Sequence, residues 1–118
     1  MLFNEVINPN HRATFLINHR RYDLYDHGEG PCTLCFIDDL PLAYDVLAFP
    51  NRFIVIDTHP TWGKNIRNLP QSGYEKLAED IHLIADIYWL DTVRIFNLPN
   101  YSHLHLLLKR KLQRRLMQ

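Results

Sequence analysis

The sequence predicts a single α+β domain whose strands form an antiparallel sheet. The chain has 118 residues, a length that suits one domain with a substantial core. Residues 43–49, 52–57, 92–97 and 102–108 are short runs with strand-like composition, and one long amphipathic segment lies between the second and third runs. The sequence repeats no strand–helix–strand unit of the kind that builds parallel sheets. We therefore expect one main helix packed on the sheet and a short basic tail after the last strand.

The first half of the chain is expected to alternate short strands with loops. Phe15-Leu16-Ile17 is a short apolar stretch, and residues 28–31 predict a loop because they contain two glycines and a proline. Pro50-Asn51 separates the runs 43–49 and 52–57 and therefore predicts a turn between antiparallel strands. Residues 59–63 predict a further loop.

The main helix is expected to begin at Ser72-Gly73-Tyr74-Glu75, which has the spacing of a capping box and follows Pro70. Apolar residues then recur every three or four positions as one stripe that continues to Trp89. The stripe consists of Tyr74, Leu77, Ile81, Ile84 and Tyr88. His82 falls off this stripe and is expected to be solvated.

Two histidines alternate with leucines in the last predicted strand, residues 102–108. In a strand, His103 and His105 would leave the same face, about 6.5–7 Å apart, while the leucines point into the core. Parallel imidazoles at this spacing suit a ligand or a nucleophile. The alternative is a half-exposed strand whose polar face happens to carry two histidines.

Composition and charge limit the class of protein. The chain is 47% hydrophobic and 22% charged, as is ordinary for a globular domain. It contains neither the ~18 consecutive apolar residues of a membrane span nor the apolar core of a signal peptide, so we expect a cytoplasmic protein without a membrane partner. The formal net charge is zero, yet five cations fall in the last ten residues, which leaves a net charge of −5 on the rest. They are Lys109, Arg110, Lys111, Arg114 and Arg115. This tail is either a solvated helix end or a handle for phosphates and nucleic acid.

The two cysteines form a Cys-x-x-Cys pair, Cys32-Thr33-Leu34-Cys35. Such a spacing lets two thiolates reach one zinc ion, which then needs two further nitrogen or sulfur ligands. His59 and His103 are the best candidates by residue type. The alternatives are a redox pair or two packed thiols.

The order of these motifs resembles the histidine triad superfamily. Residues 99–106 are most similar to its aprataxin-type and galactose-1-phosphate uridylyltransferase-type branches, and residues 49–53 resemble the Asn-x-Phe element of those branches. The resemblance covers residues 32–108, and residues 1–31 are an N-terminal extension of unknown role. The resemblance implies the HIT-like fold, bound zinc and, as in many members of the superfamily, a homodimer.

The resemblance also implies a chemistry, in which a histidine attacks a nucleotide α-phosphate and forms a nucleotidyl-histidine intermediate. His105 matches the nucleophile, and His103 matches a zinc ligand that borders the substrate. Asn97 and Ser102 match positions that orient the nucleophile or hold phosphate oxygens. Phe49 and Asn51 would border the pocket for a nucleotide or a nucleotidylated small molecule.

Two departures from the family pattern leave two functions open. Leu107 occupies the third triad position, and Asn65 stands at the usual third zinc ligand, for which His59 could substitute. The first function is a nucleotide hydrolase or nucleotidyltransferase. The second is a catalytically weakened module that binds zinc or nucleotide and contacts nucleic acid or a protein partner. The sequence does not specify the base, the leaving group or the pathway.

Overall fold

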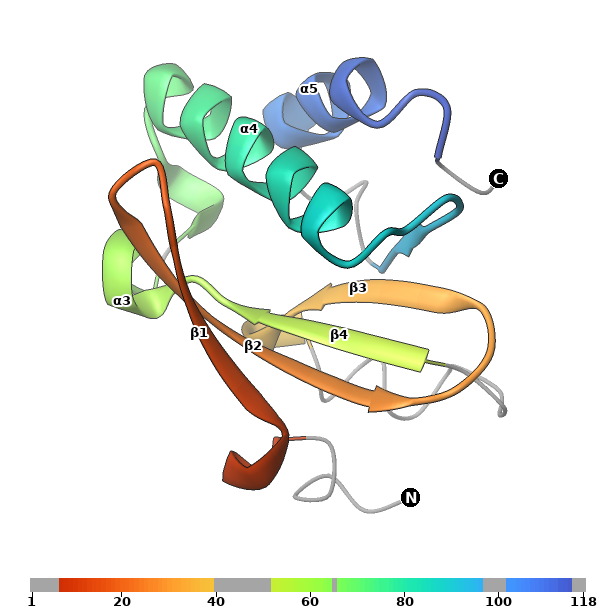
Figure 1. Cartoon of the computed structure of the whole chain (residues 1–118). Coiled ribbons are helices and arrows are strands. Elements are labelled where there is room, and N and C mark those ends of the chain that lie inside the picture. The colour runs from red at the N-terminus through yellow and green to blue at the C-terminus, as the bar shows by residue number, and fades with distance from the viewer. Residues whose placement is uncertain (1–6, 40–51, 65, 97–101, 116–118) are drawn as a thin grey trace.

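The structure is a computed structural model that describes residues 7–39, 52–64, 66–96 and 102–115 (Figure 1). Its strands are β1 (Arg12–Ile17), β2 (Arg20–Gly28), β3 (Cys32–Phe36), β4 (Arg52–Asp57) and β5 (Arg94–Ile95). Its α-helices are α3 (His59–Trp62), α4 (Gln71–Ile87) and α5 (Ser102–Lys111), and its 3-10 turns are η1 (Pro9–His11), η2 (Ile37–Asp39) and η3 (Ile66–Asn68). The α+β class is therefore confirmed, whereas the predicted strand 43–49 lies outside the described residues.

The described strands form one mixed sheet in the order β1-β2-β4-β3-β5. β2 is antiparallel to β1 and to β4, whereas β3 is parallel to β4 and to β5. The expectation of a purely antiparallel sheet was thus wrong. Residues 37–51 connect β3 to β4, and this length meets the requirement of about a dozen residues between parallel neighbours.

A tight hairpin joins β1 to β2. Ile17 pairs with Arg20, and the two residues between them, Asn18 and His19, have φ angles of 51° and 66°. Positive φ at both central positions is typical of the turn type that matches the twist of hairpin strands. This hairpin places β1 at one edge of the sheet.

Helix α4 confirms the main helix, with two corrections at its ends. The N-cap position is Pro70, so Ser72 lies inside the helix instead of capping it. The helix ends at Ile87, and the predicted stripe does not extend to Trp89, which has a φ of 56° and is 89% exposed. Between these ends, the buried residues of α4 include Tyr74, Leu77, Ile81 and Ile84, as the periodicity predicted.

Helices α4 and α5 cover one face of the sheet (Figure 1). The main hydrophobic core lies between these layers and unites Leu24, Leu34 and Ile56 of the sheet with residues of both helices. A smaller buried cluster of Cys35, Phe53 and Val55 lies apart from it. Because side chains alternate along a strand, neighbouring positions of β3 and β4 contribute to different clusters.

A buried carboxylate ties α4 to the β1–β2 hairpin. Asp80 is fully buried and accepts hydrogen bonds from Asn18 Nδ2 at 2.9 Å and from Arg20 Nε and Nη2 at 2.6 and 2.9 Å. The Tyr22 hydroxyl also donates to Asp80 and accepts a 2.8 Å bond from Trp62 Nε1 of α3. Burial, together with the bond to Asp80, raises the pKa of Tyr22. This network, which we call the Asp80 cluster, joins three elements around one charge.

Residues 102–108 are helical, and the expectation of a final strand was wrong. Leu104 and Leu108 are fully buried, whereas Leu106 between them is 63% exposed. Residues four apart share a helix face, and residues two apart do not. Of the predicted strand 92–97, the structure assigns only Arg94–Ile95 to β5.

Candidate functional site

The helix at residues 102–111 removes the geometry on which the predicted histidine site depended. Positions 103 and 105 are two residues apart along α5, with one residue between them, and so do not share a face. The side chains of Ser102, His103 and His105 lie outside the described part of the structure, as do the whole residues Phe49, Asn51, Asn65 and Asn97. The nucleotidyl-histidine mechanism therefore stays a prediction of the sequence, without the shared strand face that suggested it.

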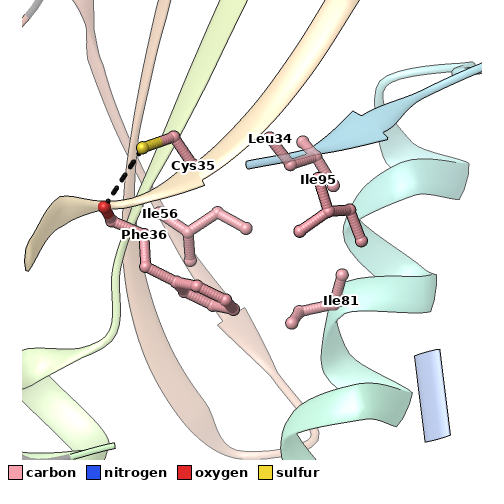
Figure 2. A pocket seen from close by; sticks show the side chains of 6 residues that line it. All are labelled: Leu34, Cys35, Phe36, Ile56, Ile81 and Ile95. Carbon is pink, nitrogen blue, oxygen red and sulfur yellow. Dashed lines mark hydrogen bonds between the residues drawn. The ribbon is translucent and has the colours of Figure 1, made fainter. Parts of the chain in front are cut away.

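The two cysteines lie on opposite faces of β3. Cys32 belongs to the main core, whereas Cys35 belongs to the smaller cluster. Figure 2 shows the Cys35 sulfur turned away from the apolar side chains of the pocket beneath β3, and its thiol donates a 3.3 Å hydrogen bond to the carbonyl of Phe36. Burial raises the pKa of Cys32 to about 11 and that of Cys35 to about 12. Because the two thiols lie on opposite faces of the strand, this structure does not bring them together around one ion, and the zinc site stays a prediction of the Cys-x-x-Cys spacing.

His59 contacts carboxylates, not the cysteines. Its Nε2 lies 3.0 Å from Asp38 Oδ1, and its Nδ1 lies 3.5 Å from Asp57 Oδ1. The Asp57 carboxylate also accepts a 3.0 Å bond from the His59 backbone N–H. Within the described ranges, no group of three or more histidine, cysteine, aspartate or glutamate residues is arranged to hold a metal ion.

The end of α5 and the turn after it form a basic surface beside α4. We call it the basic α5 surface and define it as Lys109, Arg110, Lys111, Arg114 and Arg115 together with His82 of α4. Leu108 and Leu112 are buried beneath it and hold the segment against α4, since the α5 core face repeats every four residues. The Val93 backbone N–H donates a 2.7 Å bond to the Arg115 carbonyl and fixes the turn to the segment before β5. The cations therefore stand on a backbone that is held in place.

This surface is hollowed into a cavity of about 230 Å³ that is lined by His82 and residues 110–115. One water molecule takes up about 30 Å³ of liquid, so the cavity has room for a phosphate group. Two nitrogens of these lining residues, Arg115 Nη1 and His82 Nδ1, are buried and have no hydrogen-bond partner among the described residues. The Arg115 guanidinium is always a donor, so its unused N–H group beside a basic cavity favours an anionic ligand with acceptor oxygens.

Acidic side chains of α4 neutralise part of the basic α5 surface. Lys111 Nζ lies 2.6 Å from Glu79 Oε2, and Arg115 pairs with Asp86, which also lies 3.6 Å from His82 Nε2. The hydrogen bond from Arg115 lowers the pKa of Asp86. No ion pair joins Lys109, Arg110 or Arg114 to a carboxylate within residues 7–39, 52–64, 66–96 and 102–115. These three cations are thus available to a partner.

The cations were predictable from the sequence, but the structural setting that surrounds them was not. His82 was expected to be solvated, and Glu79 and Asp86 were not considered, although their three- and four-residue spacing places the three side by side on a helix. That spacing was the available signal. The spacing alone could not show which element packs beside this polar face of α4, because residues 102–108 were expected to form a strand of the sheet.

Known protein families and curated proteins offer no match to this chain. No protein-family model matches it, and a search of curated proteins finds no significantly similar sequence. The resemblance to the histidine triad superfamily, and the chemistry that it implies, therefore stay predictions. None of the helices in the described ranges has the length and apolar character needed to cross a membrane.

Proposed function

We propose that this protein binds the phosphate groups of a nucleic acid through its basic α5 surface. The observation that carries the proposal is a set of exposed cations, Lys109, Arg110 and Arg114, that have no carboxylate partner among the described residues and lie at or next to a cavity lined by Arg115. A guanidinium group can donate to two phosphate oxygens at once. Four cationic residues that lie close together in the sequence, Lys109, Arg110, Arg114 and Arg115, can contact successive phosphates of a nucleic-acid strand.

The arrangement of the cations favours a polyanion over a single small anion. Lys109, Arg110 and Arg114 are all exposed, and they extend from the last turn of α5 into the turn that follows. A pocket for one isolated phosphate would instead turn its cations towards one point. Phosphates repeated along a strand can meet several of these side chains while another phosphate occupies the cavity at Arg115.

The charge distribution predicts strong salt dependence. The chain has no net charge, so attraction comes from the local field of the basic α5 surface and not from the whole protein. Exposed charges are largely screened beyond about 10 Å at 0.1 M salt. The proposed contact is therefore a close-range contact to the phosphate backbone, with little selection among bases.

The test is fluorescence anisotropy with labelled single-stranded RNA and duplex DNA, each titrated at several salt concentrations. We expect binding to at least one of them at low salt, with an affinity that depends little on base sequence. Arg110→Ala and Arg114→Ala should each weaken binding and reduce the slope of log K against log salt by about one.

Arg12→Ala is the matched control, because it removes one exposed arginine from β1, in the other layer of the fold. This variant should bind as the wild-type chain does. The proposal fails if neither nucleic acid binds at low salt, or if Arg12→Ala weakens binding as much as Arg110→Ala does.

A further inference from the structure

Two histidines lie against each other at the opposite end of the β1–β2 hairpin from its turn. His11 is the last residue of η1, and His27 lies near the end of β2. Their Nδ1 atoms are 3.5 Å apart, and their ring centroids are 5.4 Å apart with the planes tilted by 35°. The two rings therefore present nitrogens to the same small volume.

We propose that His11 and His27 form a two-imidazole site for a divalent transition-metal ion such as zinc. Tetrahedral zinc with Zn–N bonds of 2.0–2.1 Å separates two ligand nitrogens by about 3.3–3.4 Å, close to the distance between these Nδ1 atoms. A direct hydrogen bond between the two rings is a poorer account, because 3.5 Å exceeds the range of about 2.7–3.2 Å that is typical of N–H···O hydrogen bonds in proteins.

The backbone holds both ligands in place. His11 closes a short turn in which its N–H donates a 2.9 Å bond to the Asn8 carbonyl, while the Asn8 side chain accepts a 2.9 Å bond from the Asn10 N–H. His27 lies on β2 and is paired with Phe53 of β4. A site whose ligands already stand together loses little conformational entropy when the ion binds.

The surroundings define which ions can bind. His11 is exposed and His27 is half-buried, so an ion can enter from solvent. The nearest acidic neighbour in sequence, Asp26, is engaged by Arg52 through bonds of 2.8 and 2.6 Å. The described residues thus supply two nitrogens, and water completes the coordination. Imidazole ligands favour zinc, copper and nickel, whereas magnesium and calcium require oxygen ligands.

The test is a zinc titration of the isotopically labelled full chain, followed by NMR of the histidine rings and by calorimetry. We expect the ring signals of His11 and His27 to shift together and to saturate, and magnesium to leave them unchanged. His11→Ala and His27→Ala should each weaken zinc binding by about tenfold or more, since even the loss of a group that only orients a ligand costs about 10–100-fold.

His19→Asn is the control, because His19 is an exposed histidine of the same hairpin and asparagine tolerates its positive φ. This variant should bind zinc as the wild-type chain does. Unchanged zinc affinity in His11→Ala and His27→Ala overturns the proposal, and so does binding that is lost only in Cys32→Ser or Cys35→Ser.

Discussion

The replacement of Leu104 by alanine tests the helical assignment of residues 102–111. The Leu104 side chain is fully buried in the main core. Its truncation removes buried methyl groups and leaves a cavity, which typically costs about 2–5 kcal/mol in the free energy of unfolding. Small domains are stable by only about 5–15 kcal/mol, so this loss is easily measured.

Leu106→Ala is the matched control two positions away. Leu106 is 63% exposed, and substitutions at exposed sites usually change the free energy of unfolding by no more than about 0.5 kcal/mol. If residues 102–108 formed a strand, the two leucines would share a buried face and both substitutions would be costly. The helix therefore predicts a large difference between the two variants, and the strand predicts similar losses.

The assay is urea unfolding followed by far-UV circular dichroism, with the midpoint and the slope compared among the three proteins. We expect Leu104→Ala to lower the midpoint at an unchanged slope, and Leu106→Ala to unfold as the wild-type chain does. Equal losses in the two variants would refute the helix and restore the strand on which the nucleotidyl-histidine hypothesis depends.

Three further predictions concern buried charge, pH and chemistry. Asp80→Ala should destabilise the fold by about 3 kcal/mol in the same assay, because it leaves the buried Tyr22 hydroxyl and the partly buried Arg20 without their acceptor. Glu75→Gln on the exposed side of α4 should stay within about 0.5 kcal/mol, and similar losses in the two variants would contradict the network. The free energy of unfolding should fall as the pH rises above 9. The reason is that unfolded thiols ionise near a pKa of 9.0, whereas burial raises the pKa of Cys32 to about 11 and that of Cys35 to about 12. If the same fall with pH persists when both cysteines are replaced by alanine, this account is wrong. Incubation with a nucleoside phosphoramidate tests the nucleotidyl-histidine hypothesis directly: an acid-labile nucleotidyl adduct that is absent in His105→Ala would support it, and the lack of any adduct or turnover would refute it.

Strong periodicity made the central elements predictable. The run 52–57 coincides with β4, and the stripe from Tyr74 to Ile84 follows the buried face of α4. β2 escaped detection because the alternation Tyr22-Asp23-Leu24 is short and Tyr25 follows Leu24 directly, so the stretch read as mixed. Asp23 is buried although its position in the alternation predicts exposure. Hydrogen bonds from Thr14 and Arg21 compensate this carboxylate, and such partners cannot be read from alternation alone.

The candidate site was harder to predict, because it depends on how segments far apart in the sequence meet. The leucines of residues 102–108 fit a strand or a helix, and the absence of any β-branched residue from residues 102–111 was a signal for the helix. The Cys-x-x-Cys spacing brings two thiols together on a turn but separates them on a strand. The sequence did not reveal β3, so the faces of Cys32 and Cys35 could not be assigned.

The Asp80 cluster has a consequence for the order of folding events. Its bonds join residues that are 58–62 positions apart in the sequence. The β1–β2 hairpin can close locally through its two-residue turn, whereas Arg20 and Tyr22 find their acceptor only after α4 has formed and docked. Closing a loop of this length costs entropy before the contact stabilises anything. We therefore expect Asp80 substitutions to change mainly the unfolding rate and to leave the folding rate nearly unaltered, as contacts made after the transition state do.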